Sequence, residues 1–189
     1  AQMEQQARMQ LEAELQQLFA DESSKVALAA KHLVTSGGKR VRPTVCLLAA
    51  RSFPPARPPA TLLGLSMVAE AIHSATLLHD DVLDLGDERR GRPAARALYG
   101  NCASVLGGDL LLIEGLKLVN AAGVPDLMTS LIDVLGRMVR AEAQQLENRG
   151  RADLSLDEYF QVVDGKTASL FEWAMEAGAR SVGAGSGLH

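Results

Sequence analysis

Three aspartates end the most apolar segment of the chain, in the sequence LLHDDVLD: Asp80, Asp81 and Asp84. Residues four apart share one face of a helix, with Cβ atoms roughly 6 Å apart, so Asp80 and Asp84 would repel each other. The negative end of the helix dipole would add to that cost. Mg²⁺ offsets it, because this ion binds one or two carboxylates together with substrate phosphates. The pattern predicts a magnesium site formed by the three aspartates; the alternative is a solvated helix end.

Basic residues flank this motif in three short segments, GGKRVRP, RRGRP and GKTA. The basic candidates are Lys39, Arg40, Arg42, Arg89, Arg90 and Lys166. Arginine forks match phosphate oxygens bidentately. His73 lies seven residues before Asp80, two helical turns away, and Thr167 adds a hydroxyl. Taken singly, these are solvated turns and a core histidine. Together they predict a site for two diphosphates, one held through metal and the other by direct cations.

The elements that must position these side chains are predicted to be helices. Aromatic residues make up 4% of the 189 residues, and no segment shows a strand pattern. Helices are expected over 3–33, from 42–43 through TVCLLAARS, and over 61–85, 101–123 and 126–148. A further helix opens at the capping box of Ser155 and Glu158. FPPARPP is expected to be a rigid linker, GDERRGRPAAR a polar connector, and SVGAGSGLH a tail that adds nothing to the core. The fold class is all-α.

Composition excludes several classes of protein. The chain is expected to be one domain, 1–189, since this length can bury a core. A net charge of -4 argues against nucleic-acid binding. The uninterrupted apolar runs are too short to span a membrane, and Glu4, Glu12 and Glu14 lead us to expect no secretion signal. Cys46 and Cys102 lack metal-site spacing and are expected to be reduced packing residues, without disulfide or zinc. A cytoplasmic protein is the expectation.

Five segments, in order, resemble one family: GGKRVRP, HSATLLHDDVLD, RRGRP, GNCASVLGGDLLL and GKTASLF. They are similar to those of the trans-prenyltransferases, the all-trans polyprenyl diphosphate synthases, and the resemblance covers Gly37 to Gly178. It implies an isoprenoid-synthase-type helical bundle around a central cavity. It also implies Mg²⁺ as cofactor and condensation of isopentenyl diphosphate with an allylic diphosphate of the geranyl or farnesyl type.

The resemblance also assigns roles to residues of this chain. For isopentenyl diphosphate it implies Lys39, Arg42, His73 and Arg90. For the allylic diphosphate it implies Asp80, Asp84, Arg89, Lys166, Thr167 and Gln145, with Glu142 a softer candidate. Arg89, Lys166 and Thr167 are the catalytic candidates, and Asp80, Asp81 and Asp84 the metal ligands. The small residues Ala75 and Thr76 occupy the family's chain-length positions, which predicts products longer than C20, of the size of a quinone side-chain precursor. A homodimer is expected, with Gly107 and Gly108 allowing close helix approach.

One family feature does not occur in this sequence. The second aspartate-rich motif, which follows the Lys-Thr pair in family members, is not present after Lys166. The resemblance therefore predicts that the C-terminal helices are missing from this chain, through truncation, and that the chain as it stands is weakly active or inactive. A non-catalytic regulatory subunit of a heteromeric synthase remains an alternative. A terpene cyclase would not need GGKRVRP, and a purely structural bundle would not explain the clustered charge.

Overall fold

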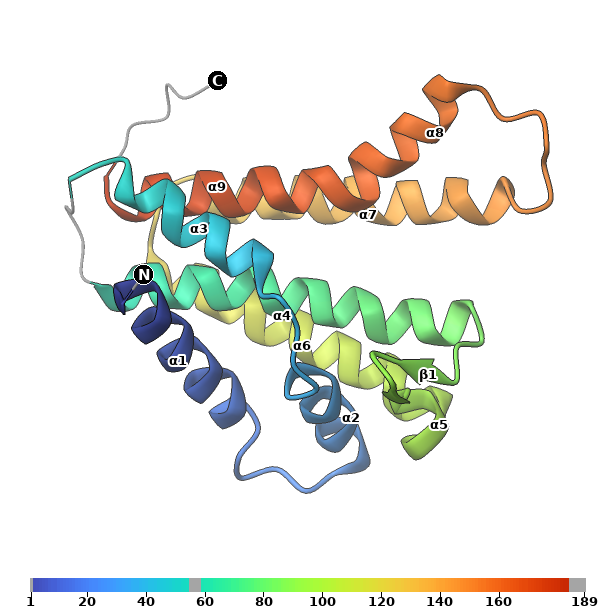
Figure 1. Ribbon diagram of the computed structural model, residues 1–189, viewed down its shortest axis with the longest axis horizontal. Helices are drawn as coiled ribbons and strands as arrows, with labels where there is room; N and C mark the ends of the chain where they lie inside the picture. Colours follow the sequence, from blue (N-terminus) through green and yellow to red (C-terminus); the bar gives the residue numbers. More distant parts are fainter. Residues whose placement is uncertain (1, 55–58, 184–189) are drawn as a thin grey trace.

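The computed structural model describes residues 2–54 and 59–183, and side chains in residues 6–54 and 60–183 (Figure 1). The helices are α1 (Gln2–Gln17), α2 (Lys25–Val34), α3 (Val41–Arg51), α4 (Pro59–Leu83), α5 (Ala95–Tyr99), α6 (Asn101–Ala122), α7 (Leu127–Glu147), α8 (Leu156–Val163) and α9 (Ser169–Ser181). A π-helical turn, η1 (Asp164–Ala168), joins α8 to α9, and two short strands, β1 (Glu88–Arg89) and β2 (Arg92–Pro93), pair antiparallel. The predicted all-α class is confirmed.

Helix α4 is the centre of the molecule, because both parts of the apolar core contact it. One core cluster joins it to α1, α2 and α6, and includes Leu78 and Leu111. The other joins it to α3, α6, α7 and α9, and includes Ile72 and Trp173. In Figure 1 α3, α7 and α9 form one layer and α4 and α6 the next, with α1 and α2 below. The aspartates at the end of α4 therefore lie between the two layers.

Helix α4 is also the one helix among residues 2–54 and 59–183 that is long and apolar enough to cross a membrane. Its segment Ala60–Leu83 has a mean hydropathy of 1.4, and 61% of that window is buried inside the protein. Glu70 and Asp81, both buried, lie on the same helix. The central helix of a folded core has this apolar composition because most of its faces are buried against other helices.

Two predicted elements differ from the structure. The expected helix over 3–33 is two helices, because the chain turns at residues 18–24 and α2 starts again with Ser24, whose hydroxyl accepts from Ala27 N–H at 3.1 Å. The polar connector after α4 contains the β1–β2 hairpin and α5. Strands of two residues are too short to show an alternating pattern, which is why the sequence did not reveal them. The predicted capping box at Ser155 and Glu158 is confirmed.

Parts of the predicted linker and tail, residues 55–58 and 184–189, lie outside the described residues. The start of the tail was wrongly excluded from the core, since Ser181 and Val182 are buried. Among the cysteines, both free, Cys46 is buried as expected, and burial raises the pKa of its thiol to about 12. Cys102 is exposed, so its prediction as a packing residue was wrong. It lies at the outer start of α6, where apolar neighbours in sequence do not enclose it.

Gly107 and Gly108 do allow close helix approach, but within this chain. A Cβ on Gly107 would lie 3.0 Å from Val26 O of α2, and one on Gly108 would lie 3.0 Å from Ala75 O of α4 and would collide with the His79 ring. Both glycines are buried. The pair therefore packs α6 against α2 and α4 and is not available to a second copy.

Candidate diphosphate-binding site

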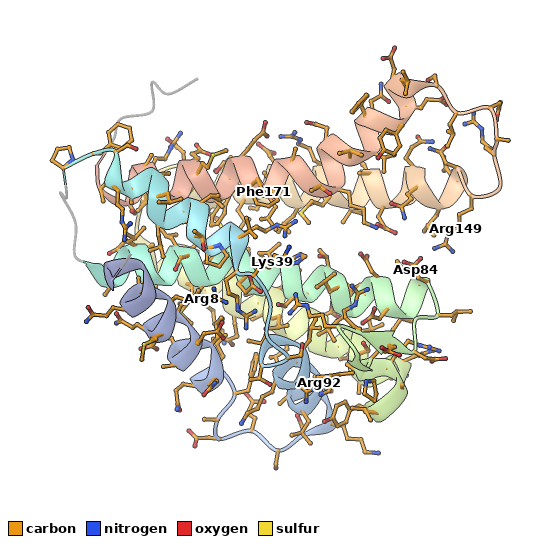
Figure 2. The ribbon with its side chains drawn as sticks, in the orientation of Figure 1. Arg8, Lys39, Asp84, Arg92, Arg149 and Phe171 are labelled. Carbon is orange, nitrogen blue, oxygen red and sulfur yellow. The ribbon has the colours of Figure 1, made fainter. Side chains whose placement is uncertain are left out.

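The last turn of α4 presents a carboxylate face to two cations from the other layer. Asp80 Oδ2 lies 3.4 Å from Lys166 Nζ of η1, and Asp84 accepts a hydrogen bond from Arg149, which follows α7. Figure 2 shows Asp84 and Arg149 at the facing ends of α4 and α7. Lys166 also pairs with Glu142 of α7. We call the three carboxylates Asp80, Asp84 and Glu142 the acidic face.

The acidic face carries uncompensated negative charge. Burial raises the pKa of Asp80; the charge of Lys166 opposes that rise only in part, and Glu142 and Asp84 add to it. Burial alone would lower the pKa of Lys166, but its hydrogen bond to Glu142 and the charge of Asp80 outweigh burial and raise it. Two cations thus serve three carboxylates. The repulsion predicted from the spacing of Asp80 and Asp84 is present, although the Asp84 side chain is 45% exposed.

The π-helical turn η1 brings Lys166 to this position. Gly165 is buried against α7, where an added Cβ would lie 2.7 Å from Ala141 Cβ. The Gly165 carbonyl accepts from the Ser169 hydroxyl at 2.6 Å. Arg137 of α7 pairs with Asp164 at 2.8 Å and with Glu172 at 2.9 Å, which ties both ends of the turn to α7. π-helical turns occur frequently at functional sites, and here the turn sets Lys166 beside the carboxylates.

Asp81 points to a different partner. It is 1% exposed, and its Oδ1 accepts from Arg89 Nε at 2.7 Å and lies 2.6 Å from Arg89 Nη2. Its Oδ2 is buried without a hydrogen-bond partner. The pair fixes β1 of the hairpin against the end of α4. Asp81 thereby orients Arg89, and its predicted role as a metal ligand stays a prediction.

A second group of side chains, the cation cluster, surrounds His73: Arg42 of α3 and Arg89 and Arg90 of the hairpin. Burial, the largest cause, and the positive charges of Arg42, Arg90, Arg89 and Arg40 together lower the pKa of His73 to about 3. Arg90 donates to Gly37 O across the gap to the loop before α3. The imidazole is therefore neutral among three guanidinium groups. Such a cluster favours a polyanion.

Burial has a clear effect on Arg42 of the cation cluster. Burial lowers its pKa, opposed by the charge of Glu70. Its Nε is buried without a hydrogen-bond partner, and its guanidinium lies over the Phe171 ring, 4.5 Å from the centroid. A cation stacked on an aromatic ring retains its in-plane donors. An unpaired donor inside a cationic pocket is the structural sign expected of an anion site.

Arg40 has a structural role that its neighbours in GGKRVRP do not share. It is 2% exposed and adopts φ 51°, and it donates to Glu12 at 2.8 Å and 2.9 Å, to Glu70 at 2.5 Å and to Val34 O at 2.7 Å. Burial would lower its pKa, but Glu12 and Glu70 raise it. Arg40 thus ties α1, α2 and α4 to the loop that carries Lys39.

The remaining predicted residues occupy varied positions. Lys39 is exposed on the loop entering α3 (Figure 2), Thr167 is exposed on η1, and Gln145 is half-buried on α7. Ala75 is 3% exposed in the core between α4 and α6. Thr76 is half-buried, and its hydroxyl donates to His73 O at 2.8 Å. A groove of about 350 Å³ between α1 and α3 does not include either chain-length residue in its lining.

Several residues of the site were not identified from the sequence. Arg149, Glu12 and Glu70 come from segments without a recognisable motif. Glu70 is one charge in the apolar stretch of α4, three residues before His73, and a buried charge of this kind needs a partner. That isolation was the available signal for Glu70. Arg149 and Glu12 lie among other charged residues, and only the fold distinguishes them.

The oxygen-rich face fits Mg²⁺ better than a softer metal. Among the residues that the structure describes, no three His, Cys, Asp or Glu side chains are grouped to hold a metal by themselves. Mg²⁺ characteristically binds through one or two carboxylates and completes its shell with water and phosphate. Glu142 Oε1 is buried without a partner, so a carboxylate oxygen remains available beside Asp80 and Asp84. Asp80 and Asp84 are the residues that would hold the ion.

Comparison with known proteins gives a consistent result. The family model for polyprenyl synthetase matches residues 23–188. Octaprenyl diphosphate synthase of Haemophilus influenzae is 38% identical over 167 residues, which are 87% of this chain and 50% of that protein. The chain spans about half the length of the curated relatives it matches.

Solved structures share the fold. A decaprenyl diphosphate synthase from Rhodobacter capsulatus aligns with a TM-score of 0.89 and 35% identity over 98% of this chain and 57% of its own. A polyprenyl synthase from Caulobacter crescentus, complexed with calcium and isoprenyl diphosphate, aligns with a TM-score of 0.88 and 31% identity, over 96% of this chain and 55% of its own. The predicted isoprenoid-synthase-type bundle is confirmed. This chain belongs to the polyprenyl synthetase family, the trans-isoprenyl diphosphate synthases.

Proposed function

We propose that the chain carries the two diphosphate sites of a prenyltransferase that condenses isopentenyl diphosphate with an allylic diphosphate. The observation that carries the proposal is that the acidic face and the cation cluster lie along the same helix, α4, about two turns apart. Asp80 and His73 mark the two sites on the same helix. One site suits a diphosphate bound through metal, and the other suits a diphosphate bound by guanidinium groups.

Each residue then has a role in the reaction. Bound Mg²⁺ would stabilise the charge that develops on the departing diphosphate as the allylic C–O bond breaks. Lys166 and Arg89 supply fixed positive charge to the same leaving group, and the exposed Thr167 hydroxyl offers it a hydrogen bond. Lys39, Arg42, His73 and Arg90 hold isopentenyl diphosphate, so that its double bond attacks the allylic cation at close range. The attack forms a C–C bond and leaves a tertiary cation on the isopentenyl unit; a proton from the carbon next to that cation passes to the released diphosphate, and its electron pair forms the new double bond.

Turnover by the chain itself tests this assignment. Incubation with Mg²⁺, isopentenyl diphosphate and farnesyl diphosphate, followed by mass spectrometry of the extracted lipids, should show elongated all-trans diphosphates at a low rate, since weak activity is what the sequence predicts for this chain. Asp80→Asn/Asp84→Asn should abolish them, while Arg151→Gln, at a surface residue paired with Asp153 and Glu158, should not. Wild-type chain that binds both diphosphates and yields no elongated product would overturn the catalytic proposal for this chain.

We propose a product longer than C20. Two of the relatives are named octaprenyl and decaprenyl diphosphate synthases, while others are named short-chain or geranylgeranyl synthases, and the support specific to this chain is that both Ala75 and Thr76 are small. Ala75→Phe should shorten the product, but the new ring would enter a packed core. Thr76→Phe, at a half-buried position, provides the same block with less overpacking. Unchanged product length in both folded variants would refute the proposed role.

We propose a homodimer as the assembly, formed through the outer face of α6. With Gly107 and Gly108 buried internally, the apolar side chains left exposed there are Val105, Leu106 and Ile113, which are 37%, 51% and 48% exposed. Leu106→Asp/Ile113→Asp should yield monomers in sedimentation velocity. Val139→Asp, on α7, serves as the control. A wild-type monomer at micromolar concentration would contradict the proposal.

The alternatives are less well supported. A non-catalytic subunit has no use for the complete acidic face with its Lys166 partner. A terpene cyclase has no second diphosphate to occupy the cation cluster. The relatives are named as synthases, which also favours catalysis.

A further inference from the structure

Arg149 is a cation of the acidic face that neither the sequence motifs nor the reaction assigned above account for. It contacts Asp84, the outermost carboxylate, and both side chains are about half exposed, 49% for Arg149 and 45% for Asp84. Figure 2 shows the two side chains at the facing ends of α7 and α4. An exposed ion pair of this kind is weak and exchanges readily.

The loop around Arg149 holds its backbone while leaving its side chain free to reorient. The preceding residue, Asn148, is buried, and its Oδ1 accepts from Gln144 at 3.0 Å and from Arg151 at 3.3 Å. The following residue, Gly150, adopts φ +80° and turns the chain away. The long arginine side chain is therefore anchored at one end only.

The charge of the site shows why this cation matters. Without Arg149, Lys166 would be the one cation paired with the acidic face, since it contacts Asp80 and Glu142 while Arg149 contacts Asp84. Arg149 removes the excess charge at Asp84. A divalent cation at Asp80 and Asp84 would take over that task, and the guanidinium would then lack its partner. The diphosphate that accompanies the metal is the nearest anion of suitable geometry, since guanidinium groups pair bidentately with phosphate oxygens.

We propose that Arg149 is an exchangeable residue of the allylic diphosphate site: it pairs with Asp84 when no metal is bound and binds the diphosphate when metal occupies the carboxylates. The inference rests on the proposed function, because it requires metal and diphosphate at the acidic face. Arg149 would then weaken the binding of metal alone, because it competes for Asp84, and strengthen the binding of diphosphate in the presence of metal. Removing Arg149 should therefore change these two affinities in opposite directions.

The test measures both signs on the full chain, in wild type, Arg149→Gln and Arg149→Lys. Electron paramagnetic resonance gives the affinity for Mn²⁺ alone, and calorimetry gives the affinity for inorganic pyrophosphate in saturating Mg²⁺. Arg149→Gln should bind Mn²⁺ about 1.5- to 5-fold more tightly, the range for loss of one exposed ion pair. It should bind pyrophosphate about tenfold more weakly, as expected for a lost charge-assisted hydrogen bond. Arg149→Lys should fall between wild type and Arg149→Gln in pyrophosphate affinity.

Lys117→Gln is the matched control, since Lys117 is a surface cation on α6 that pairs with Glu114, and it should change neither affinity. Circular dichroism should show unchanged folding in all variants. Equal weakening of both affinities in Arg149→Gln, or no change in either, would overturn the inference while leaving the proposed function intact. If Mn²⁺ binding by the wild-type chain did not depend on Asp80, both the inference and the proposed function would be wrong.

Discussion

The two ends of the site are constructed differently. Around His73, the supporting charges are inside the protein: Arg40 and Glu70 are 2% and 3% exposed and pair with each other. At the acidic face, the supporting pair of Asp84 and Arg149 is about half exposed. Both ends lie along α4, so the difference between them comes from the residues that support each end.

The difference corresponds to what each end has to bind. The cation cluster would receive a diphosphate directly, and buried ion pairs hold its loop and helices in place beforehand. The acidic face would receive metal and diphosphate together, and its exposed pair of Asp84 and Arg149 must give way when they arrive. Buried pairs are costly to break, whereas exposed pairs are not. The site therefore combines a rigid half with a replaceable half.

The strongest test of the rigid half is removal of Arg40. Arg40→Ala would leave Glu70 buried without its partner and should lower the free energy of unfolding by about 3–5 kcal/mol. Urea unfolding followed by circular dichroism measures this loss. The exposed Arg8, which donates to Gly38 O at 3.2 Å, provides the control as Arg8→Ala and should have little effect. A loss below about 1 kcal/mol for Arg40→Ala would show that the pair is not a rigid support.

His73 gives the rigid half a pH dependence. Its folded pKa of about 3 lies below the ordinary histidine value, so the unfolded chain takes up the proton first as the pH falls below about 6.5. The free energy of unfolding should therefore decrease from pH 6.5 towards pH 3, by at most about 1.4 kcal/mol per pH unit from this group. His73→Gln should reduce the slope of stability against pH in this window. An identical slope in both proteins would contradict the neutral, buried assignment.

Bound pyrophosphate should raise the pKa of His73, which the surrounding guanidinium groups lower. Negative charge within the cation cluster offsets the surrounding guanidinium groups, so pyrophosphate should move the pKa of His73 upward in an NMR titration. The Arg42→Gln/Arg90→Gln variant, which lacks two of those groups, should show a smaller movement. No movement at saturating pyrophosphate would indicate that the anion does not enter this cluster.

The exposed ion pair of the replaceable half should have a small coupling free energy. A double-mutant cycle with Asp84→Asn and Arg149→Gln, without metal, should give a coupling of about 0.2–1 kcal/mol. High salt should remove most of it, because the Debye length falls to about 3 Å at 1 M. A coupling that exceeds about 2 kcal/mol and persists in salt would show that this pair is a fixed structural contact and would erase the contrast between the two halves.

The residues with motif spacing were predictable, whereas their supports were not. The interval between Asp80 and Asp84 indicates a shared helical face. The sequence also predicts that the basic segment GKTA lies near the aspartates, and in the structure Lys166 of that segment pairs with Asp80. The sequence could not distinguish the structural role of Arg40 from the predicted substrate-binding role of Lys39, because the two are adjacent in one loop. Their surroundings differ only after α1 and α4 pack around Arg40. The split between α1 and α2 was missed although the polar run from Asp21 to the N-cap Ser24 marks it, because a run of four polar residues also fits the exposed face of a continuous helix. Arg149 reaches Asp84 through a contact 65 residues away, which no local pattern encodes.

The most direct test of two distinct diphosphate sites is calorimetry of pyrophosphate with and without Mg²⁺. The account predicts one site that binds without metal and a second that appears only with Mg²⁺. Arg42→Gln/Arg90→Gln should weaken the first, and Asp80→Asn/Asp84→Asn should remove the second alone. A single site in both conditions, or a metal-dependent site that survives the loss of both aspartates, would contradict the account.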